Sequence, residues 1–183
     1  MNETFNSYSL AGEDPNPQTV DEVNYLKELV QSLPQNPVIV NIGAERGTST
    51  IAMLETRPDA YIFSIDTDEC DGERKNAERA GMDLRHIVRV LGRSQEIGKF
   101  WPYVVDMVFI DGDHHYEGVK GDIAVWKGLV VSGGILAFHD YFEGPPPAHN
   151  PSGAGEAVRE MMVESNDVHM IRLVDRLMAF RKK

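Results

Sequence analysis

The hydrophobic positions divide the chain into alternating helical and extended stretches. From residue 19 to residue 33, apolar side chains recur every three or four positions and Pro34 ends the pattern, which predicts an amphipathic helix. Short runs rich in β-branched and aromatic residues predict strands over residues 38–42, 61–65, 87–91, 106–110 and 135–138. Stretches with helical spacing predict helices between them, over residues 48–55, 73–80, 95–100 and 117–130.

The last part of the chain breaks this alternation. Residues 141–155 are rich in proline and glycine, which predicts a loop and a candidate lid, and a helix is expected over residues 156–164. The apolar runs 168–174 and 177–181 are separated by only two residues. So short a link cannot form a parallel crossover, so we expect an antiparallel hairpin.

The spacing of the elements predicts the fold class. Each predicted strand and its following helix take roughly 20–30 residues, which is typical of parallel βαβ units. Nearly continuous apolar strands indicate a sheet covered on both faces. We therefore expect an α/β three-layer sandwich, and one domain over residues 1–183. Its parts would be a loose arm (1–18), a cap helix (19–33) and a catalytic core (38–183).

Composition narrows the possible partners and location. The chain has 29 Asp and Glu against 18 Lys and Arg, a formal net charge of −11. Such a surface repels phosphate groups and anionic lipid, so we expect neither nucleic acid nor a membrane as partner. A single cysteine excludes an internal disulfide. The sequence shows no signal-peptide pattern and no apolar stretch of membrane-spanning length, so we expect a cytoplasmic protein.

Two glycines, Gly43 and Gly47, follow the first predicted strand. Ligands of open α/β sheets bind beyond the carboxyl ends of the strands, and glycine lets the backbone approach a ligand closely. The spacing differs from the G-x-G-x-x-G of dinucleotide-binding proteins, and no P-loop lysine follows. The turn is therefore either a binding turn for another ligand or a purely structural one.

Polar residues also follow the second and third predicted strands. Asp66 lies about 20 residues beyond the glycines, where an acid can accept hydrogen bonds from ribose hydroxyls; alternatively, it caps a helix. With the glycine turn, it favours a nucleoside-bearing ligand. Ser94 and Gln95 can hydrogen-bond an adenine edge, or they belong to an ordinary polar loop with a serine cap.

The densest cluster of reactive side chains follows the fourth and fifth predicted strands. Asp111 and His114 lie after the fourth strand, and His139 and Asp140 lie after the fifth. If these strands are neighbours, Asp111, His139 and Asp140 converge. Carboxylates suit Mg²⁺ or Ca²⁺, and an added imidazole suits Mn²⁺, Fe²⁺ or Zn²⁺. The alternative is a substrate pocket that holds no metal.

These motifs occur in a fixed order that resembles a known family. The order is N-I-G-A-E-R-G-T-S, S-I-D-T, G-R-S-Q-E, F-I-D-G-D-H-H-Y-E and G-G-I-L-A-F-H-D-Y. It is similar to class I S-adenosylmethionine-dependent methyltransferases, and within them to the bacterial D-G-D-H-x-Y and H-D-Y branch (methyltransferase family 24-like). That branch is akin to catechol O-methyltransferase and to the macrolide and aminocoumarin sugar O-methyltransferases. The resemblance covers about residues 38–182 and implies a Rossmann-like sheet of strand order 3-2-1-4-5-7-6.

The resemblance also implies a cofactor, S-adenosylmethionine, and the residues that hold it. Asp66 would bind the ribose, and Ser94 and Gln95 would flank the adenine. The methionine part would be lined by residues of the first strand and its turn, namely Asn41, Gly43, Glu45, Gly47 and Ser49.

The implied chemistry is transfer of a methyl group to a small-molecule hydroxyl, as in a sugar, phenol or natural product. Asp111 is similar to the first metal-binding aspartate of catechol O-methyltransferase, and it also borders the cofactor. The other two metal ligands fall at His139 and Asp140, which would hold Mg²⁺ or another divalent metal. The catalytic lysine of that family is replaced by His114. Asp111, His114 or His139 is therefore the expected base.

Two positions depart from the family pattern. Asn41 stands where the first strand usually ends in Glu or Asp, so a charge that helps to hold the cofactor's ammonium group is lost. His139 replaces a carboxylate, which makes Mg²⁺ less favoured and leaves a metal-free mechanism as an alternative. Two further interpretations are a non-catalytic cofactor-binding module and a non-haem iron hydroxylase. The resemblance also implies a homodimer.

Overall fold

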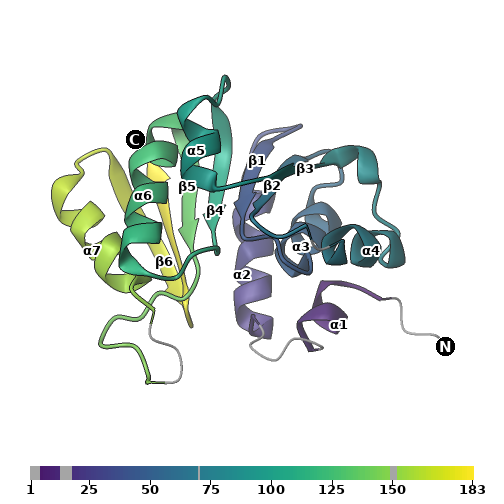
Figure 1. The fold of residues 1–183 in the computed structure, drawn as a ribbon, viewed down its shortest axis with the longest axis horizontal. Coiled ribbons are helices and arrows are strands. Elements are labelled where there is room, and N and C mark those ends of the chain that lie inside the picture. Colours follow the sequence, from purple (N-terminus) through teal and green to yellow (C-terminus); the bar gives the residue numbers. More distant parts are fainter. Residues whose placement is uncertain (1–4, 13–17, 70, 149–151) are drawn as a thin grey trace.

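The computed structural model describes residues 5–12, 18–69, 71–148 and 152–183. Its strands are β1 (Val38–Ile42), β2 (Tyr61–Asp66), β3 (Ile87–Leu91), β4 (Val105–Ile110), β5 (Val130–Phe138), β6 (Val168–Val174) and β7 (Leu177–Lys182). They form a seven-stranded sheet in the order β3-β2-β1-β4-β5-β7-β6 (Figure 1). The expected strand order and the Rossmann-like α/β fold are confirmed.

The registers of the strands bring the predicted site residues to one edge of the sheet. Strands β1 to β5 are parallel, whereas β7 pairs antiparallel with both β5 and β6. Ile42 at the end of β1 is level with Ile65 of β2 and with Ile110 of β4. The chain therefore leaves these strands at the same edge. The residues that follow there are Gly43, Asp66 and Asp111.

Helices cover both faces of the sheet. They are α1 (Ser7–Gly12), α2 (Val20–Gln31), α3 (Thr48–Thr56), α4 (Gly72–Arg79), α5 (Ser94–Lys99), α6 (Tyr116–Trp126) and α7 (Ala154–Glu164). Helices α5, α6 and α7 lie on one face, and the others lie on the opposite face (Figure 1). Trp126 and Phe138 are buried in the core between the sheet and helices α5 to α7, and Leu26 and Met53 are buried in the core on the opposite face. Burying an apolar side chain of this size stabilises the fold by about 1.5–3 kcal/mol, and these two cores hold the strands that carry the site.

Two parts of the sequence prediction are corrected by the structure. Residues 7–12 of the expected loose arm form helix α1, because Leu10 is fully buried against Ile51 and Ala77. The remaining arm residues 1–4 and 13–17 lie outside the described residues. The helix expected to reach residue 130 ends at Trp126, where a 3₁₀ turn, η2 (Lys127–Leu129), leads into a longer β5.

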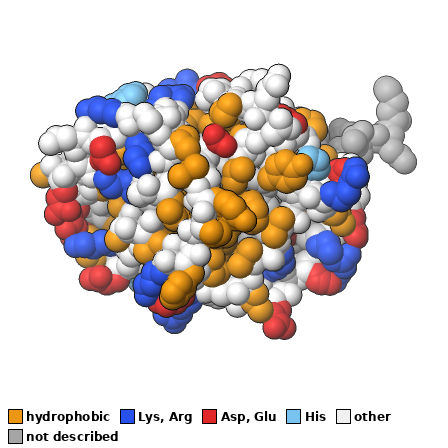
Figure 2. Space-filling model, turned by 90° about the horizontal axis from the view of Figure 1, so that it is seen from above, with side chains coloured by type: hydrophobic (Ala, Val, Ile, Leu, Met, Phe, Trp, Pro, Cys, Tyr) orange, Lys and Arg blue, Asp and Glu red, His pale blue; other side chains and the backbone are white. Residues whose placement is uncertain are grey.

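The opposite edge of the sheet carries exposed apolar side chains. Figure 2 shows the face at the amino-terminal ends of the parallel strands, where hydrophobic side chains gather near the middle. Phe100, Tyr103 and Val104, which precede β4, are 85%, 63% and 64% exposed. This patch lies away from the edge where the predicted site residues meet. Within the described ranges, no helix has both the length and the apolar character needed to cross a bilayer.

Candidate active site

The turn after β1 depends on a glycine. Gly43 has φ of +82°, and a Cβ atom there would lie 2.2 Å from the carbonyl oxygen of Asp111. Only glycine lets the end of β1 lie this close to the end of β4. Gly47 has φ of +90° and immediately precedes α3. The two glycines therefore determine the conformation of the turn that connects β1 to α3.

Asp66 connects the turn after β1 to the end of β2. Its Oδ2 accepts a hydrogen bond from the backbone N–H of Glu45 at 2.9 Å, and its Oδ1 accepts one from Asp68 at 3.0 Å. It lies in a first cavity of about 360 Å³. The lining residues are Ile42, Gly43, Ile65, Asp66, Thr67, Gly92, Arg93, Ser94, Gln95, Gly112 and Asp113. Asp66, Ser94 and Gln95, predicted from separate motifs, thus share one cavity.

Ser94 and Gln95 also bind helix α6. The Ser94 hydroxyl donates to the carboxylate of Asp122, which is fully buried. Burial raises the pKa of Asp122 to about 6, because the charged form loses its water. The Gln95 amide donates to the carbonyl oxygen of Gly118 at 3.2 Å. These bonds to α6 hold the segment after β3 in place along the cavity.

A second cavity of about 410 Å³ adjoins the first and shares Gly43 with it. Its lining residues are Gln18, Gly43, Ala44, Glu45, Arg46, Thr48, Ser49, Asp111, His114, His139 and Asp140. It therefore combines Glu45 and Ser49, expected beside the methionine part of a cofactor, with the cluster after β4 and β5. Gly47 shapes the turn without lining either cavity.

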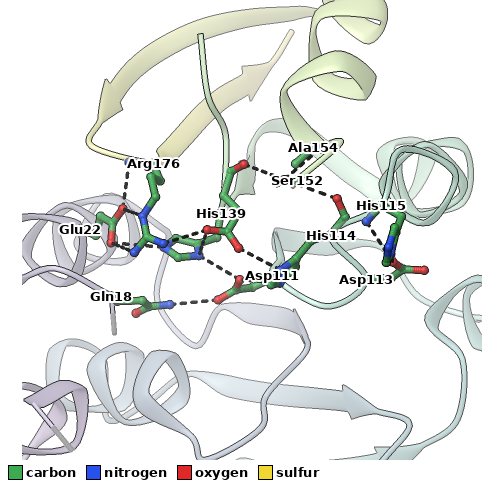
Figure 3. Close-up of polar contacts among 11 residues, drawn as sticks. Gln18, Glu22, Asp111, Asp113, His114, His115, His139, Ser152, Ala154 and Arg176 are labelled. Atoms are coloured by element: carbon green, nitrogen blue, oxygen red, sulfur yellow. Dashed lines mark hydrogen bonds and ion pairs between the residues drawn. The ribbon is translucent and has the colours of Figure 1, made fainter. Parts of the chain in front are cut away.

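His139 lies at the centre of that cluster, between the carboxylates of Glu22 and Asp111 and near that of Asp140 (Figure 3). Its Nδ1 is 3.0 Å from Oδ1 of Asp111 and 3.7 Å from Oδ1 of Asp140. Its Nε2 is 3.2 Å from Oε2 of Glu22, a residue of α2. Burial lowers the pKa of His139, but the carboxylates of Asp111 and Glu22 outweigh it and raise the pKa well above its usual value. Each nitrogen of the imidazole thus faces a carboxylate within ion-pair distance.

Further polar residues surround this centre. Gln18 donates to Oδ2 of Asp111 at 3.1 Å, and Arg176 donates to Oδ1 of Asp140 at 3.0 Å. Burial raises the pKa of Asp140, but the hydrogen bond from His114 and nearby cations hold the pKa at about 2. Sequence reasoning missed Gln18, Glu22 and Arg176, because they come from segments that carry no catalytic motif. Their role becomes visible only when α2 and the β6–β7 turn pack against the sheet edge.

His114 is the histidine of the cluster that remains open to solvent. Its Nδ1 is 3.0 Å from Oδ2 of Asp140, its Nε2 is 3.7 Å from Oδ1 of Asp111, and its side chain is 40% exposed. The hydrogen bond to Asp140 raises the pKa of His114 despite partial burial. The neighbouring His115 turns away from the cluster and pairs with Asp113 at 2.7 Å (Figure 3).

Asn41 lies beneath the turn and lines neither cavity. Its Nδ2 donates to the hydroxyls of Ser49 at 3.0 Å and Thr50 at 2.9 Å. The Thr50 hydroxyl in turn donates to the buried carboxylate of Glu73 at 2.5 Å. A hydroxyl has one proton to donate, and Thr50 gives it to Glu73. Its oxygen can therefore only accept from residue 41, and an amide can donate there whereas an ionised carboxylate cannot. This hydrogen bond explains why an amide fits at position 41.

The end of the candidate lid lies beside the cluster. Ser152 donates to the carbonyl oxygen of Asp140 at 2.9 Å, and the backbone N–H of Gly153 donates to that of His114 at 2.7 Å. Residues 149–151 of the predicted lid lie outside the described part of the chain. The loop after β5 is thus attached to both strand ends that carry the cluster.

The donor set of this cluster fits a divalent cation. One ligand atom from each of Asp111, His139 and Asp140 lies within 4.8 Å of the other two. Two carboxylates and one imidazole nitrogen suit Mn²⁺, Fe²⁺ or Zn²⁺ better than Mg²⁺, which prefers oxygen ligands. The strand ends of β4 and β5 bring these atoms together, so Asp111, His139 and Asp140 are the residues that would hold the cation.

Comparison with known sequences identifies the class of protein that carries this site. A methyltransferase domain family matches residues 40–141, more than half of the chain. The chain belongs to this methyltransferase domain family. The methyltransferase family expected from the sequence is thereby confirmed.

The chain is also similar to a viral protein and to solved structures of the same fold. The chain is 29% identical over 114 residues to the uncharacterized protein R132 of Acanthamoeba polyphaga mimivirus, covering 56% of this chain and 50% of that protein. It thus spans about half the length of this relative. An O-methyltransferase of Bacillus cereus, solved in complex with SAH, superposes with a TM-score of 0.71 at 20% identity, covering 95% of this chain and 86% of that one. An SAH-bound methyltransferase of Podospora anserina gives 0.76 at 18% identity, with 97% and 86% covered. At such identities the likeness concerns the fold.

Proposed function

We propose that this protein is an S-adenosylmethionine-dependent O-methyltransferase that methylates a hydroxyl group of a small molecule. The observation that carries the proposal is the shared boundary of the two cavities at Gly43. Asp66, the proposed ribose acceptor, lies on one side of it, and the Asp111 cluster lies on the other. A cofactor that spans the boundary would present its reactive methyl group to an acceptor held beside that cluster.

The proposed cofactor site follows the two cavities. Asp66 would accept from the ribose hydroxyls, and Ser94 and Gln95 would border the adenine. Glu45 and Ser49 would border the methionine part, and the glycines of the turn allow the close backbone approach. The sulfonium group of the cofactor supplies a methyl group that is already reactive, so the protein must orient the acceptor and remove its proton. The SAH-bound neighbours of the same fold support this assignment.

The proposed metal ligands are Asp111, His139 and Asp140. A divalent metal bound there would lower the pKa of the acceptor hydroxyl and orient its oxygen. Asp111 and Asp140 contribute the negative charge that a cation requires, and His139 contributes one nitrogen. We treat residues 1–183 as one methyltransferase domain, in which α2 covers the acceptor side of the site.

His114 is the proposed base. Its Nδ1 faces the carboxylate of Asp140 at 3.0 Å, so Asp140 can hold the Nδ1–H tautomer and leave Nε2 to accept a proton. His139 is buried with its two nitrogens facing the carboxylates of Glu22 and Asp111, which leaves no nitrogen open to an acceptor. Nε2 of His114 would take the proton of the acceptor hydroxyl as that oxygen received the methyl group, and S-adenosylhomocysteine would be the product left in the cofactor site.

Replacement of Asp111 by alanine tests the proposal. Asp111→Ala should lower methyl transfer by at least about 100-fold, because the acceptor loses both a metal ligand and a negatively charged neighbour. Affinity for S-adenosylhomocysteine, measured by calorimetry, should change by no more than a few-fold. Transfer is measured with radiolabelled cofactor against a panel of sugars and phenols.

A surface variant serves as the control. Asp83 pairs with Arg85 on the surface, outside both cavities, so Asp83→Ala should leave transfer unchanged. If Asp111→Ala turns over like the wild type, the acceptor does not react at this cluster and the proposed site is wrong.

A further inference from the structure

Helix α2 directs a buried carboxylate at the cluster. Glu22 is 1% exposed, and its Oε2 lies 3.2 Å from Nε2 of His139. The opposite nitrogen of the same ring, Nδ1, faces Asp111. Figure 3 shows Glu22 and Asp111 on the two sides of the His139 ring. The ring therefore lies between one carboxylate of the proposed metal site and one carboxylate outside it.

A carboxylate on the far side of the ring is typical of histidines that bind a metal through the other nitrogen. A metal-bound imidazole usually donates its other ring N–H to a carboxylate, which fixes the tautomer and the ring orientation. Nε2 of His139 lies 3.2 Å from Oε2 of Glu22, so the ring can keep its proton on this nitrogen, and a metal that displaces the proton of Nδ1 would meet a lone pair directed toward Asp111 and Asp140. We propose that Glu22 is a positioning residue of the metal centre, acting through His139. This inference rests on the proposed function, because it assumes that the cluster binds a metal.

Glu22 is itself held in place from two directions. Its Oε2 accepts from the backbone N–H of Thr19 at 2.7 Å, and its Oε1 accepts from the backbone N–H of Arg176 at 2.8 Å. Neither donor can rotate away, since both belong to the backbone. The carboxylate is therefore fixed by the start of α2 and by the β6–β7 turn, and its direction toward His139 follows from that fixation.

Arg176 extends the same support to a second ligand. Its guanidinium group donates to Glu22 at 3.3 Å and to Oδ1 of Asp140 at 3.0 Å. It thus neutralises the extra carboxylate and orients Asp140. Glu22 and Arg176 lie outside residues 40–141, the part of the chain that matches the family. The outer support of the metal centre therefore comes from segments on either side of that matched part.

The experiment measures metal affinity in the full chain. Glu22→Gln keeps the size of the side chain but removes its charge and places an amide donor near the N–H groups that Glu22 accepts. We expect Mn²⁺ to bind 10–100-fold more weakly to this variant by calorimetry, the range typical when such a carboxylate is lost. The paramagnetic resonance spectrum of bound Mn²⁺ provides a second readout that is independent of methyl transfer.

Two control variants separate positioning from stability. Glu28 lies on the same helix and pairs with Arg172 on the surface, so Glu28→Gln should bind Mn²⁺ like the wild type. Thr19→Ala weakens the start of α2 but keeps the backbone N–H that Glu22 accepts. If Thr19→Ala loses as much Mn²⁺ affinity as Glu22→Gln, the effect is one of helix stability, and the inference is overturned.

A third variant distinguishes this inference from the proposed metal site. Asp111→Asn removes a proposed ligand. If it leaves Mn²⁺ affinity unchanged, the cluster is no metal centre and the metal part of the proposed function fails. If Asp111→Asn weakens binding while Glu22→Gln does not, the metal centre stands and only the role of Glu22 is overturned.

The orientation of His139 can also be tested on the wild-type protein, without relying on the folding of any variant. In the Zn²⁺-loaded protein, nitrogen–proton correlation spectra of the imidazole rings report which nitrogen is bound to metal and which carries a proton. We expect His139 to be coordinated through Nδ1 and protonated at Nε2. Coordination through Nε2, or an Nε2 without a proton, contradicts the orientation by Glu22.

Discussion

Gly43 is the residue on which the geometry of the site depends most directly. Gly43→Ala would place a Cβ atom 2.2 Å from a backbone oxygen at a φ of +82°. We expect a loss of more than about 2 kcal/mol in the free energy of unfolding, measured in urea. Gly81 has a φ of +72° with no atom near its missing Cβ, so Gly81→Ala should cost only about 1 kcal/mol. Equal losses would show that close contact with Asp111 is unimportant.

Asp122 gives a second prediction for a single residue, on how the stability of the fold depends on pH. Burial raises its pKa from 3.8 to about 6, so the fold favours its protonated form. The stability that this adds is present below about pH 4 and is lost as the pH rises through about 6. Asp122→Asn keeps an acceptor for Ser94 and carries no charge. It should therefore exceed the wild type in stability at pH 7.5, by up to about 3 kcal/mol, and match it near pH 4.

Thermal unfolding of both proteins across this pH range measures the difference. Asp83 serves as a control of opposite sign, because Arg85 lowers the pKa of its exposed carboxylate. Asp83→Asn should show no gain at pH 7.5. A difference between Asp122→Asn and the wild type that stays constant with pH would contradict a burial-raised pKa.

The sequence pattern predicted elements well where their core-facing positions repeat. Strands β1 to β4 and helix α2 were placed within about two residues, because their apolar positions are regular. Helix α1 was missed because six residues have little helical tendency alone, and its stability comes from packing Leu10 against other helices. The start of β5 was missed because Gly133 and Gly134 interrupt its apolar run. A Cβ at Gly134 would lie 2.8 Å from the carbonyl of Asp106, a contact invisible in the sequence.

The start of α2 gives a prediction at the scale of an element. The Thr19 hydroxyl accepts from the backbone N–H of Glu22 at 3.1 Å and donates to Asp175 at 2.6 Å. It therefore caps the helix and connects it to the β6–β7 turn. Thr19→Ala should cost about 1–2 kcal/mol, which lowers Tm by roughly 2–8 °C for a chain of this size. Thr19→Ser keeps the hydroxyl and should lose much less. Equal Tm values for the two variants would exclude a role for the cap.

At the scale of the whole molecule, the two cavities draw on partly different strand ends. Residues after β2 and β3 line only the first cavity and residues after β5 line only the second, whereas residues after β1 and β4 line both. The sequence could place Asp66 and Asp111 because both follow strands. It could not place Glu22 or Arg176, because their position depends on how the two chain segments outside the family match pack at the sheet edge. Motifs thus revealed the centre of the site, and packing revealed its support.

Which cofactor binds depends on residues along the whole carboxyl-terminal edge of the sheet. Thermal unfolding with different ligands tests this choice. A ligand that binds only the folded state at 100 times its Kd adds about 2.7 kcal/mol, or roughly 5–10 °C in Tm at this chain length. S-adenosylmethionine and S-adenosylhomocysteine should both produce such a shift. NAD should not, because the Gly43 turn lacks the glycine spacing that dinucleotides require.

A variant shows whether the shift arises at the first cavity. Asp66→Ala removes the proposed ribose acceptor and also the acceptor for the backbone N–H of Glu45, so the cofactor should raise its Tm far less. The unliganded Tm of this variant must be measured alongside, since loss of the turn contact lowers it independently. A full cofactor shift in Asp66→Ala would place the ribose elsewhere, and a shift produced by NAD alone would assign this edge to a dinucleotide. The test therefore decides between two cofactors through one carboxylate, because the ribose hydroxyls are the part of the ligand that the end of β2 is positioned to meet.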